Sequence, residues 1–258
     1  MAAARRLAED RIEVWELEVA TALGPRHTPS VDDRSLLAQV LTRVAPLEPP
    51  ALEAVLGAFV PRTMLADERL WPAGAVCAEI AFVCRGVLVS QSVVSDRAAS
   101  CDLFAEGDFA TDYVSFLTQA PSTVELVALE PCAVLSISRS ALERLYETVP
   151  GVDRVGRKLA EAQFVGLVHR AGSLLAESPA ARYRALGARR PDLLQRVPQY
   201  LIARWLGVTP ESLSRIRRRL SAPQRTVTST VSAPPPKSKA PASKPGGPSA
   251  PRASREKP

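Results

Sequence analysis

The stretch between about residues 64 and 139 consists of short β-rich runs separated by turn residues. We expect turns at Arg85-Gly86, at Ser95-Asp96-Arg97 and at Glu106-Gly107-Asp108. Short strands with turns every eight to twelve or so residues favour an antiparallel sandwich or barrel. The runs in question are AVCAEIAFV, GVLVSQSVV, ASCDLF, TVELVALE and AVLSISR.

Helical periodicity lies on both sides of this β-rich block. The segments LLAQVLTRV and PPALEAVLGAF precede it, and SALERLYETV follows it and stops at Pro150-Gly151. Helices segregated from an antiparallel sheet are typical of the α+β class. We therefore expect an α+β fold, with a partly helical N-terminal extension over residues 1–35.

Residues 152–178 predict one long helix that is apolar on more than one side. Such a helix must be covered twice. We expect one side to pack on the β domain and the other on a second copy of the helix, with burial wholly inside one chain as the alternative. Gly166 and Gly172 weaken the helix by about 1 kcal/mol each relative to Ala, which suits a close approach of backbones. The apolar positions are Val152, Val155, Leu159, Ala162, Phe164, Val165, Leu167, Val168, Ala171, Leu174 and Leu175.

The next distinctive segment predicts two short helices joined by a glycine turn. In VPQYLIARWLG, residues 197–207, Gly207 permits a sharp turn because glycine tolerates positive φ. In VTPESLSRIRRRL, residues 208–220, Thr209 is suited to cap a helix and Pro210 to its first position. A helix, a tight turn and a capped helix form a helix-turn-helix, whose second helix can enter the major groove of DNA.

The second of these helices has an apolar stripe and a basic face. Leu213, Ile216 and Leu220 fall at helical spacing on one side. A solvated basic face is the plain alternative, but the cap, the glycine turn and both apolar stripes favour DNA binding. The residues on roughly the opposite side are Glu211, Ser212, Arg215, Arg218 and Arg219.

The net charge of +6 does not by itself point to DNA. Residues 222–258 hold seven Lys and Arg and one Glu, a surplus of six, so residues 1–221 are formally neutral. This tail is rich in Pro, Ser and Lys, and we expect it to be disordered because it has too little apolar surface to bury. It is either a solubilising extension or a basic arm that adds nonspecific phosphate contacts.

Catalytic and metal-binding patterns are missing from the sequence. His27 and His169 lie far apart, no cluster has metal-ligand spacing and no G-x-S-x-G motif occurs. We therefore expect no enzyme, no metal and no cofactor. We expect the four scattered cysteines, Cys77, Cys84, Cys101 and Cys132, to be buried reduced thiols.

The sequence also argues against membrane insertion and secretion. No apolar run approaches 18 residues, and the N-terminus lacks a continuous apolar segment of the signal-peptide type. We expect a cytoplasmic protein.

From about residue 48 to 221 the order of motifs resembles the Crp/Fnr family of bacterial transcription regulators. The resemblance rests on ERLWPAGAVCAEIAFVCRGVL, on LFAEGDFATDYVSFLTQAPSTVELVALEPCAVLSISRSALERLY and on ARYRALGARRPDLLQRVPQYLIARWLGVTPESLSRIRRRL. It implies a jelly-roll-like antiparallel β-roll of the cyclic-nucleotide-binding type, a long dimerisation helix and a C-terminal DNA-binding domain. The implied domains are an extension at 1–35, the β-roll at 36–150, the dimer helix at 151–177, the helix-turn-helix at 178–221 and the tail at 222–258.

The resemblance also implies roles for individual residues of the second helix. Thr209 would contact a phosphate, Glu211 a base edge suited to cytosine N4, and Arg215 a base edge or phosphate, in agreement with the chemistry of these side chains. Ser212 could reach a base or phosphate, and Arg217, Arg218 and Arg219 would hold phosphate. Pro210 stands where many relatives have an arginine, so the target sequence cannot be copied from them.

The β-roll departs from the relatives that bind cyclic AMP. Their Gly-Glu-Leu motif reads Thr111-Asp112-Tyr113 here, and their phosphate-binding Arg-Ser or Arg-Thr reads Ser122-Thr123. Asp112, Ser122 and Thr123 therefore mark the candidate effector pocket. Without an arginine a buried phosphate is costly, so we expect poor binding of cyclic AMP. The N-terminal part has no cysteine cluster of the kind that holds an iron–sulfur cofactor in some relatives. The chain after Leu220 lacks the family's usual β-hairpin wing.

The partners implied are double-stranded DNA, a second copy of the chain through residues 152–175, a small-molecule effector and RNA polymerase. The competing hypothesis is a ligand- or protein-binding sensor whose helix-turn-helix is vestigial. Its support is the missing wing, the altered pocket and Pro210.

Overall fold

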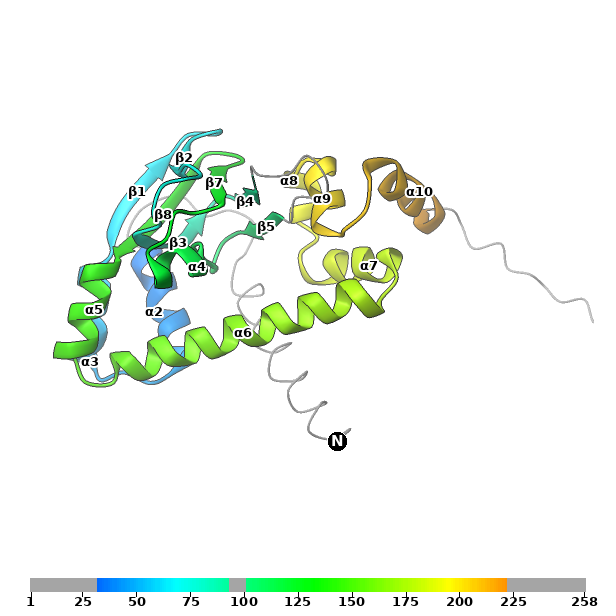
Figure 1. Cartoon of the computed structure of the whole chain (residues 1–258). Coiled ribbons are helices and arrows are strands. Elements are labelled where there is room, and N and C mark those ends of the chain that lie inside the picture. The colour runs from blue at the N-terminus through cyan, green and yellow to red at the C-terminus, as the bar shows by residue number, and fades with distance from the viewer. Residues whose placement is uncertain (1–31, 93–100, 222–258) are drawn as a thin grey trace, which may run out of the picture. The chain divides into compact units, whose positions relative to one another are not determined.

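The computed structural model describes residues 32–92 and 101–221 of the chain (Figure 1). The expected N-terminal extension up to residue 31, the turn at Ser95-Asp96-Arg97 and the tail at 222–258 lie outside the described residues. Within the described ranges no helix is both long and apolar enough to cross a bilayer.

Two antiparallel four-stranded sheets form the centre of the fold. The first has the order β1-β8-β3-β6, formed by Val60–Met64, Cys132–Ser138, Glu79–Arg85 and Phe109–Ala110. The second has the order β2-β7-β4-β5, formed by Arg69–Trp71, Val124–Ala128, Leu88–Ser92 and Cys101–Phe104. The register pairs Phe82 with Leu135 in the first sheet and Val89 with Val127 in the second. The sequence prediction of antiparallel strands in an α+β fold is confirmed.

The alternation along β8 assigns its side chains to two different cores. Leu135 and Ile137 pack with helices on one face of the first sheet. Cys132 and Val134 point to the other face and pack against the second sheet, where Leu88 and Leu126 are fully buried. The strand is therefore covered on both faces, and only Ser138 at its end is exposed.

Two helices that precede the strands along the chain and one that follows them pack together on the first sheet. Helices α2, Asp32–Val44, and α3, Pro49–Ala58, precede β1, and α5, Arg139–Thr148, follows β8. Pro49 and Pro50 open α3, where a missing N–H costs nothing. Ser138 caps α5 by accepting from the Ala141 N–H. The helix α2 begins before residue 36, the residue at which the β-roll domain was expected to start.

The predicted long helix is present as α6, Val152–Ala176, and is continuous over 25 residues (Figure 1). It begins after Gly151, whose φ of +85° is in the left-handed region. Val152 and Val155 join the helix-covered core and Leu159 packs against it, but several large apolar side chains farther along are open to solvent. Phe164 is 67% exposed, Leu167 63% and Leu175 90%. Burial of this helix wholly inside one chain, the alternative above, is wrong for these positions.

Four further helices complete the described chain. They are α7, Pro179–Arg189, α8, Leu193–Arg196, α9, Gln199–Trp205, and α10, Pro210–Ser221. Ser178, directly before Pro179, caps α7 by accepting from the Ala181 N–H. The buried apolar residues of α7 to α10 belong to a third core that also includes Val87, Val89, Cys101 and Val127 of the second sheet and its adjoining turn.

Candidate nucleic-acid interface

The predicted glycine turn joins α9 to α10. Gly207 has a φ of +69°, and its N–H donates to the Arg204 carbonyl over 3.0 Å. A Cβ at this position would lie 3.1 Å from Leu174 Cδ2 of α6. Glycine is therefore favoured twice, by the left-handed backbone and by the close approach of α6.

The start of α10 is capped as its sequence predicted. Thr209 Oγ1 accepts from the Ser212 N–H over 3.3 Å, which satisfies one of the free donors of the first turn. The pKa of Glu211 is lowered by a hydrogen bond from its own backbone N–H and by one from the Thr209 side chain. Glu211 is thus an exposed anion at the positive end of the helix dipole.

The apolar anchorage of α10 is shorter than the sequence predicted. Leu213 is 1% exposed and Ile216 is half-buried, but Leu220 is 38% exposed. Leu220 lies in the last turn of α10, which ends at Ser221. The predicted stripe of three residues therefore anchors the helix mainly through Leu213.

The basic face of α10 is open. Arg215, Arg218 and Arg219 are exposed, and none of them makes a hydrogen bond or ion pair with another residue in the described ranges. Arg217 differs, because its Nη1 donates to Gln199 Oε1 over 2.8 Å. Glu211 is exposed and Ser212 half-buried on the same helix. The arrangement supplies three cationic donors and one acceptor on a surface that a polyanion can reach.

A buried arginine that the sequence did not predict as functional stabilises the turn between α9 and α10. Arg182 of α7 is only 8% exposed, and its Nε and Nη2 donate to the Leu206 carbonyl over 3.1 and 2.8 Å. Its Nη1 donates to the carbonyls of Ser173 and Glu177 over 3.0 and 2.6 Å. The guanidinium thereby joins the C-terminal end of α6 to the end of α9. The sequence could have indicated this burial, because Arg182 lies four residues before buried Leu186 on the apolar side of α7.

A second missed arginine connects the same helices to the second sheet. Arg170 of α6 donates to the carbonyls of Cys101 and Trp205 over 3.0 and 3.4 Å. Its guanidinium also lies 4.7 Å from the centre of the Trp205 ring and 3.2 Å from Asp102 Oδ1. Helix α6, strand β5 and helix α9 therefore meet at one side chain.

The structure brings together two of the three residues expected to line an effector pocket. Asp112 caps α4, Tyr113–Thr118, and its Oδ2 accepts from the Ser122 hydroxyl over 2.7 Å. Its Oδ1 accepts from the N–H groups of Val114 and Ser115. Ser122 is buried, while Thr123 next to it is exposed. Both oxygens of Asp112 are therefore occupied by bonds within the chain.

The cysteines are buried, and the described residues contain no group of three or more His, Cys, Asp or Glu side chains placed to hold a metal ion. Burial raises the pKa of Cys84 to about 12 and that of Cys101 and Cys132 to about 11. All four thiols are free, so the prediction of buried reduced thiols is confirmed.

Solved structures share this arrangement of elements. The c-di-GMP-responsive global regulator CLP of Xanthomonas campestris is 19% identical over 68% of this chain and 92% of its own, with a TM-score of 0.54. FixK2 of Bradyrhizobium japonicum is 19% identical over 63% and 84%, with a TM-score of 0.50. A putative cyclic nucleotide binding protein of Ruegeria pomeroyi is 22% identical over 75% and 89%, with a TM-score of 0.51.

No protein-family model and no curated protein sequence matches the chain. The structural likenesses concern the architecture, which in this chain consists of two antiparallel sheets, a long helix and a C-terminal pair of helices joined by a glycine turn. The chain has the fold of the Crp/Fnr type of regulator.

Proposed function

We propose that the protein is a sequence-specific DNA-binding transcriptional regulator that acts as a homodimer and reads an inverted repeat. The observation that carries this proposal is the open basic face of α10, whose three exposed arginines stand on a capped helix anchored by buried Leu213. The regulators that share its fold support it. In this proposal residues 36–150 form the sensor, 151–177 the dimer helix and 178–221 the DNA-binding domain.

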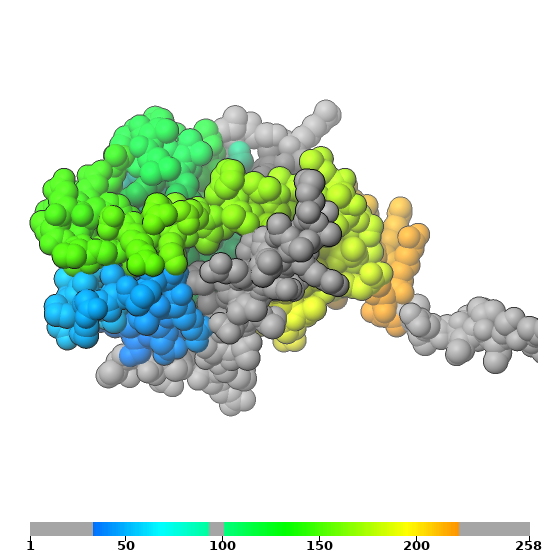
Figure 2. Space-filling view, turned by 90° about the horizontal axis from the view of Figure 1, so that it is seen from below, coloured from blue at the N-terminus to red at the C-terminus, as the bar shows by residue number. Residues whose placement is uncertain are grey.

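The exposed residues of α6 support the dimer. Phe164, Val168, Ala171 and Leu175 follow one another at spacings of four, three and four, the seam of a pair of helices. These side chains are exposed in the single chain, and part of α6 lies open beside α2 and α3 in Figure 2. Nothing lies within 4 Å of a Cβ built on Gly166 or Gly172, so a second helix has room to approach closely. The homodimer would form through residues 152–175.

The residues of α10 would divide into those that contact base edges and those that contact phosphates. Arg215 suits the O6 and N7 acceptors of guanine, and Glu211, kept ionised by its lowered pKa, suits the amino group of cytosine. Arg218 and Arg219, one turn from the C-terminal end, suit phosphate, as does Thr209 at the start. Ser212 would meet either a base or a phosphate.

The β-roll would bind an effector other than cyclic AMP. Asp112 and Ser122 are bonded to each other, and no arginine follows at the position that would neutralise a cyclic phosphate. Exposed Thr123 adds one hydroxyl. A small-molecule effector, contact with RNA polymerase and action in the cytoplasm belong to the same proposal.

Selection of bound sequences from random double-stranded DNA tests the proposal. We expect an inverted repeat whose half-sites lie about one helical turn apart, matching two copies of α10. The control is a chain with Arg215, Arg218 and Arg219 replaced by Ser, which should enrich no sequence. Enrichment of no sequence by the unaltered protein would favour the competing hypothesis of a sensor with a vestigial helix-turn-helix.

A further inference from the structure

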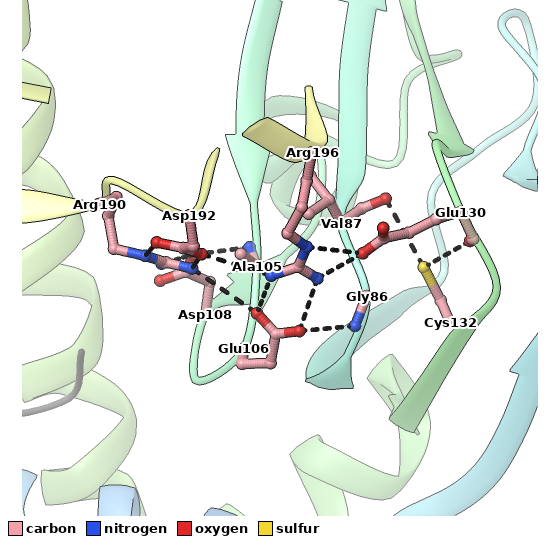
Figure 3. A network of polar contacts seen from close by, with 10 residues as sticks. All are labelled: Gly86, Val87, Ala105, Glu106, Asp108, Glu130, Cys132, Arg190, Asp192 and Arg196. Atoms are coloured by element: carbon pink, nitrogen blue, oxygen red, sulfur yellow. Dashed lines mark hydrogen bonds and ion pairs between the residues drawn. The ribbon is translucent and has the colours of Figure 1, made fainter. Parts of the chain in front are cut away.

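Six charged side chains join the helix-turn-helix segment to two turns of the β-roll (Figure 3). Glu106 and Asp108 lie in the turn between β5 and β6, and Glu130 lies in the turn between β7 and β8. Arg190, Asp192 and Arg196 come from the segment between α7 and α9. We call these six residues the docking cluster.

Arg196 is the centre of the docking cluster. Its Nη2 and Nη1 donate to Glu106 Oε1 and Oε2 over 2.7 and 3.1 Å, a bidentate pair. Its Nε donates to Glu130 Oε1 over 3.0 Å, and its Nη1 also reaches Asp192 Oδ2 over 3.3 Å. Figure 3 shows the guanidinium between the two glutamates, so one side chain of α8 is tied to both turns of the β-roll.

The surrounding contacts fix the carboxylates in turn. Glu106 Oε1 accepts from the Gly86 N–H over 2.8 Å, and Asp108 Oδ2 accepts from the Ala105 N–H over 2.8 Å. Arg190 donates to both oxygens of Asp192 and lies 3.6 Å from Glu106. The Glu106 side chain is 17% exposed and that of Arg196 27%, so water screens these pairs less than it would an open surface pair.

Beside the docking cluster the same two parts of the chain share an apolar core. Val87, Val89 and Cys101 on the β-roll side are buried with Leu193, Val197 and Leu201 of the helical segment. The Cys101 thiol donates to the Leu201 carbonyl over 3.5 Å. In this conformation the helix-turn-helix is therefore packed on the β-roll and is not merely tethered to it.

The packed arrangement leaves the basic face of α10 open, because Arg215, Arg218 and Arg219 are exposed in it. A dimer that reads an inverted repeat gains from holding both of its reading helices in fixed positions, since the second half-site then binds at a high effective concentration. A loosely tethered helix-turn-helix would lose this advantage without losing its affinity for one half-site.

We propose that the docking cluster fixes the helix-turn-helix on the β-roll in the DNA-competent arrangement, so that Arg196 determines affinity for the full inverted repeat and not for a single half-site. This inference rests on the proposed function. Arg196 is a positioning residue, because it acts through the placement of α10 and touches no DNA.

The first test needs no DNA. The buried Cys101 thiol reports on docking, since α9 covers it and it has to become exposed before it reacts with N-ethylmaleimide. Arg196→Glu places a fifth carboxylate among four and should accelerate alkylation of Cys101 by about 10-fold or more, as local opening does for any protected group. Cys84, buried under the helices on the other side of the first sheet, is the internal control and should keep its rate. Peptide mass spectrometry separates the two sites.

The second test compares DNA affinities. Arg196→Glu should weaken binding to the full inverted repeat by on the order of 10-fold and leave half-site binding within about 2-fold. Glu106→Gln is the conservative second variant, which keeps the shape of the side chain and should change both measurements in the same direction by less. The matched control is Arg62→Glu, which breaks ion pairs with Glu68 and Glu79 inside the β-roll and should change neither measurement.

The outcomes separate the two proposals. Unchanged Cys101 alkylation, or tighter binding to the full repeat by both variants, would overturn the inference about the docking cluster while leaving the proposed function in place. An equal loss on half-site and full repeat would also overturn it, because the cluster would then merely support the fold of the helix-turn-helix. Failure of the unaltered protein to bind any DNA would overturn the proposed function and the DNA-competent assignment with it.

Discussion

Three arginines near the C-terminal helices act differently because they are buried to different degrees. Arg182 is buried and donates only to backbone carbonyls, so it supports the local fold. Arg196 is partly covered and pairs with carboxylates of another part of the chain. Arg215 is exposed and makes no hydrogen bond within the described ranges, which leaves it free for a ligand. The sequence placed Arg215 on the basic face of its helix, but it did not show that Arg182 is buried or that Arg196 pairs with carboxylates of the β-roll.

The exposed arginines of α10 should separate base reading from phosphate binding. Arg215→Ala should cost roughly 1–3 kcal/mol of specific DNA affinity and relax the preference at one base pair of each half-site. Arg219→Ala should weaken binding about equally for all sequences and make it less sensitive to salt. Gel shifts with a panel of single-base variants at two salt concentrations measure both effects. A uniform loss for Arg215→Ala would assign it to phosphate instead.

Arg182 should stabilise the fold through its hydrogen bonds and not merely through its positive charge. Arg182→Met removes the donors to the carbonyls of Leu206, Ser173 and Glu177, and leaving buried acceptors unpaired costs about 1–3 kcal/mol. Chemical denaturation should therefore show a lower free energy of unfolding. Arg184→Met, an exposed neighbour on the same helix, is the matched control. Equal stability of the two variants would contradict the structural role of Arg182.

At the scale of elements, β8 and α10 follow their sequence patterns to different extents. The alternation in β8 was visible in the sequence, and its bounds are close to those expected. The pattern could not tell that both faces are covered, because that depends on helices and strands far away in sequence. In α10 the cap and Leu213 were predictable from local chemistry, but the exposure of Leu220 depends on tertiary packing that the helical spacing does not contain.

The docking cluster was also invisible in the sequence. The three carboxylates from the β-roll turns precede the two arginines by about 60 to 90 positions, and each resembles an ordinary turn or helix residue. What the sequence did contain was the turn Glu106-Gly107-Asp108 and the segment around Arg196, with nothing to indicate that they meet. Tertiary packing of α8 on the β-roll creates the contact.

The docking cluster should make stability depend on acidity. Burial alone would raise the pKa of Glu106, but hydrogen bonds from Arg196 and from backbone N–H groups, including that of Gly86, outweigh it and lower the pKa. The pKa of Asp192 is likewise lowered, because hydrogen bonding to Arg190 outweighs its partial burial. A carboxylate whose pKa is lower in the folded state stabilises the fold above its ordinary pKa and loses this contribution as the pH falls toward the lowered value.

Denaturant titrations between neutral and acidic pH test this dependence. The unaltered protein should lose stability on acidification, and Glu106→Gln should lose less, because its amide takes up no proton in this range. Arg190, Arg196 and the Gly86 N–H, which face Glu106, do not titrate between neutral and acidic pH. The carboxylates of Glu130 and Asp192, which share Arg196 with Glu106, are present in both proteins. Identical acid dependence of the two proteins would show that Glu106 titrates alike in the folded and unfolded states.

At the scale of the whole molecule, the single chain leaves large apolar side chains of α6 exposed. The spacing of these side chains favours their burial against α6 of a second copy. Phe164, Val168 and Leu175 are each more than half exposed, which is unusual for large apolar side chains spaced along one helix. Pairing of two such helices would also set the distance between two copies of α10, because Arg182 and Arg170 connect the end of α6 to α9. Dimerisation and DNA reading are thus mechanically linked in the proposed function.

Val168→Glu tests this link between dimer and DNA. The substitution would bring a carboxylate from each chain into the apolar seam, at a cost of about 1–3 kcal/mol for each buried polar group without a partner. We expect dimer dissociation at concentrations where the unaltered protein stays paired, measured by sedimentation, together with loss of the preference for the inverted repeat over a half-site. Leu65→Glu, at an exposed leucine of the β-roll, should change neither property. A Val168→Glu protein that remains dimeric would place the dimer contact elsewhere, and full-repeat binding by a monomer would show that one chain can read the site alone.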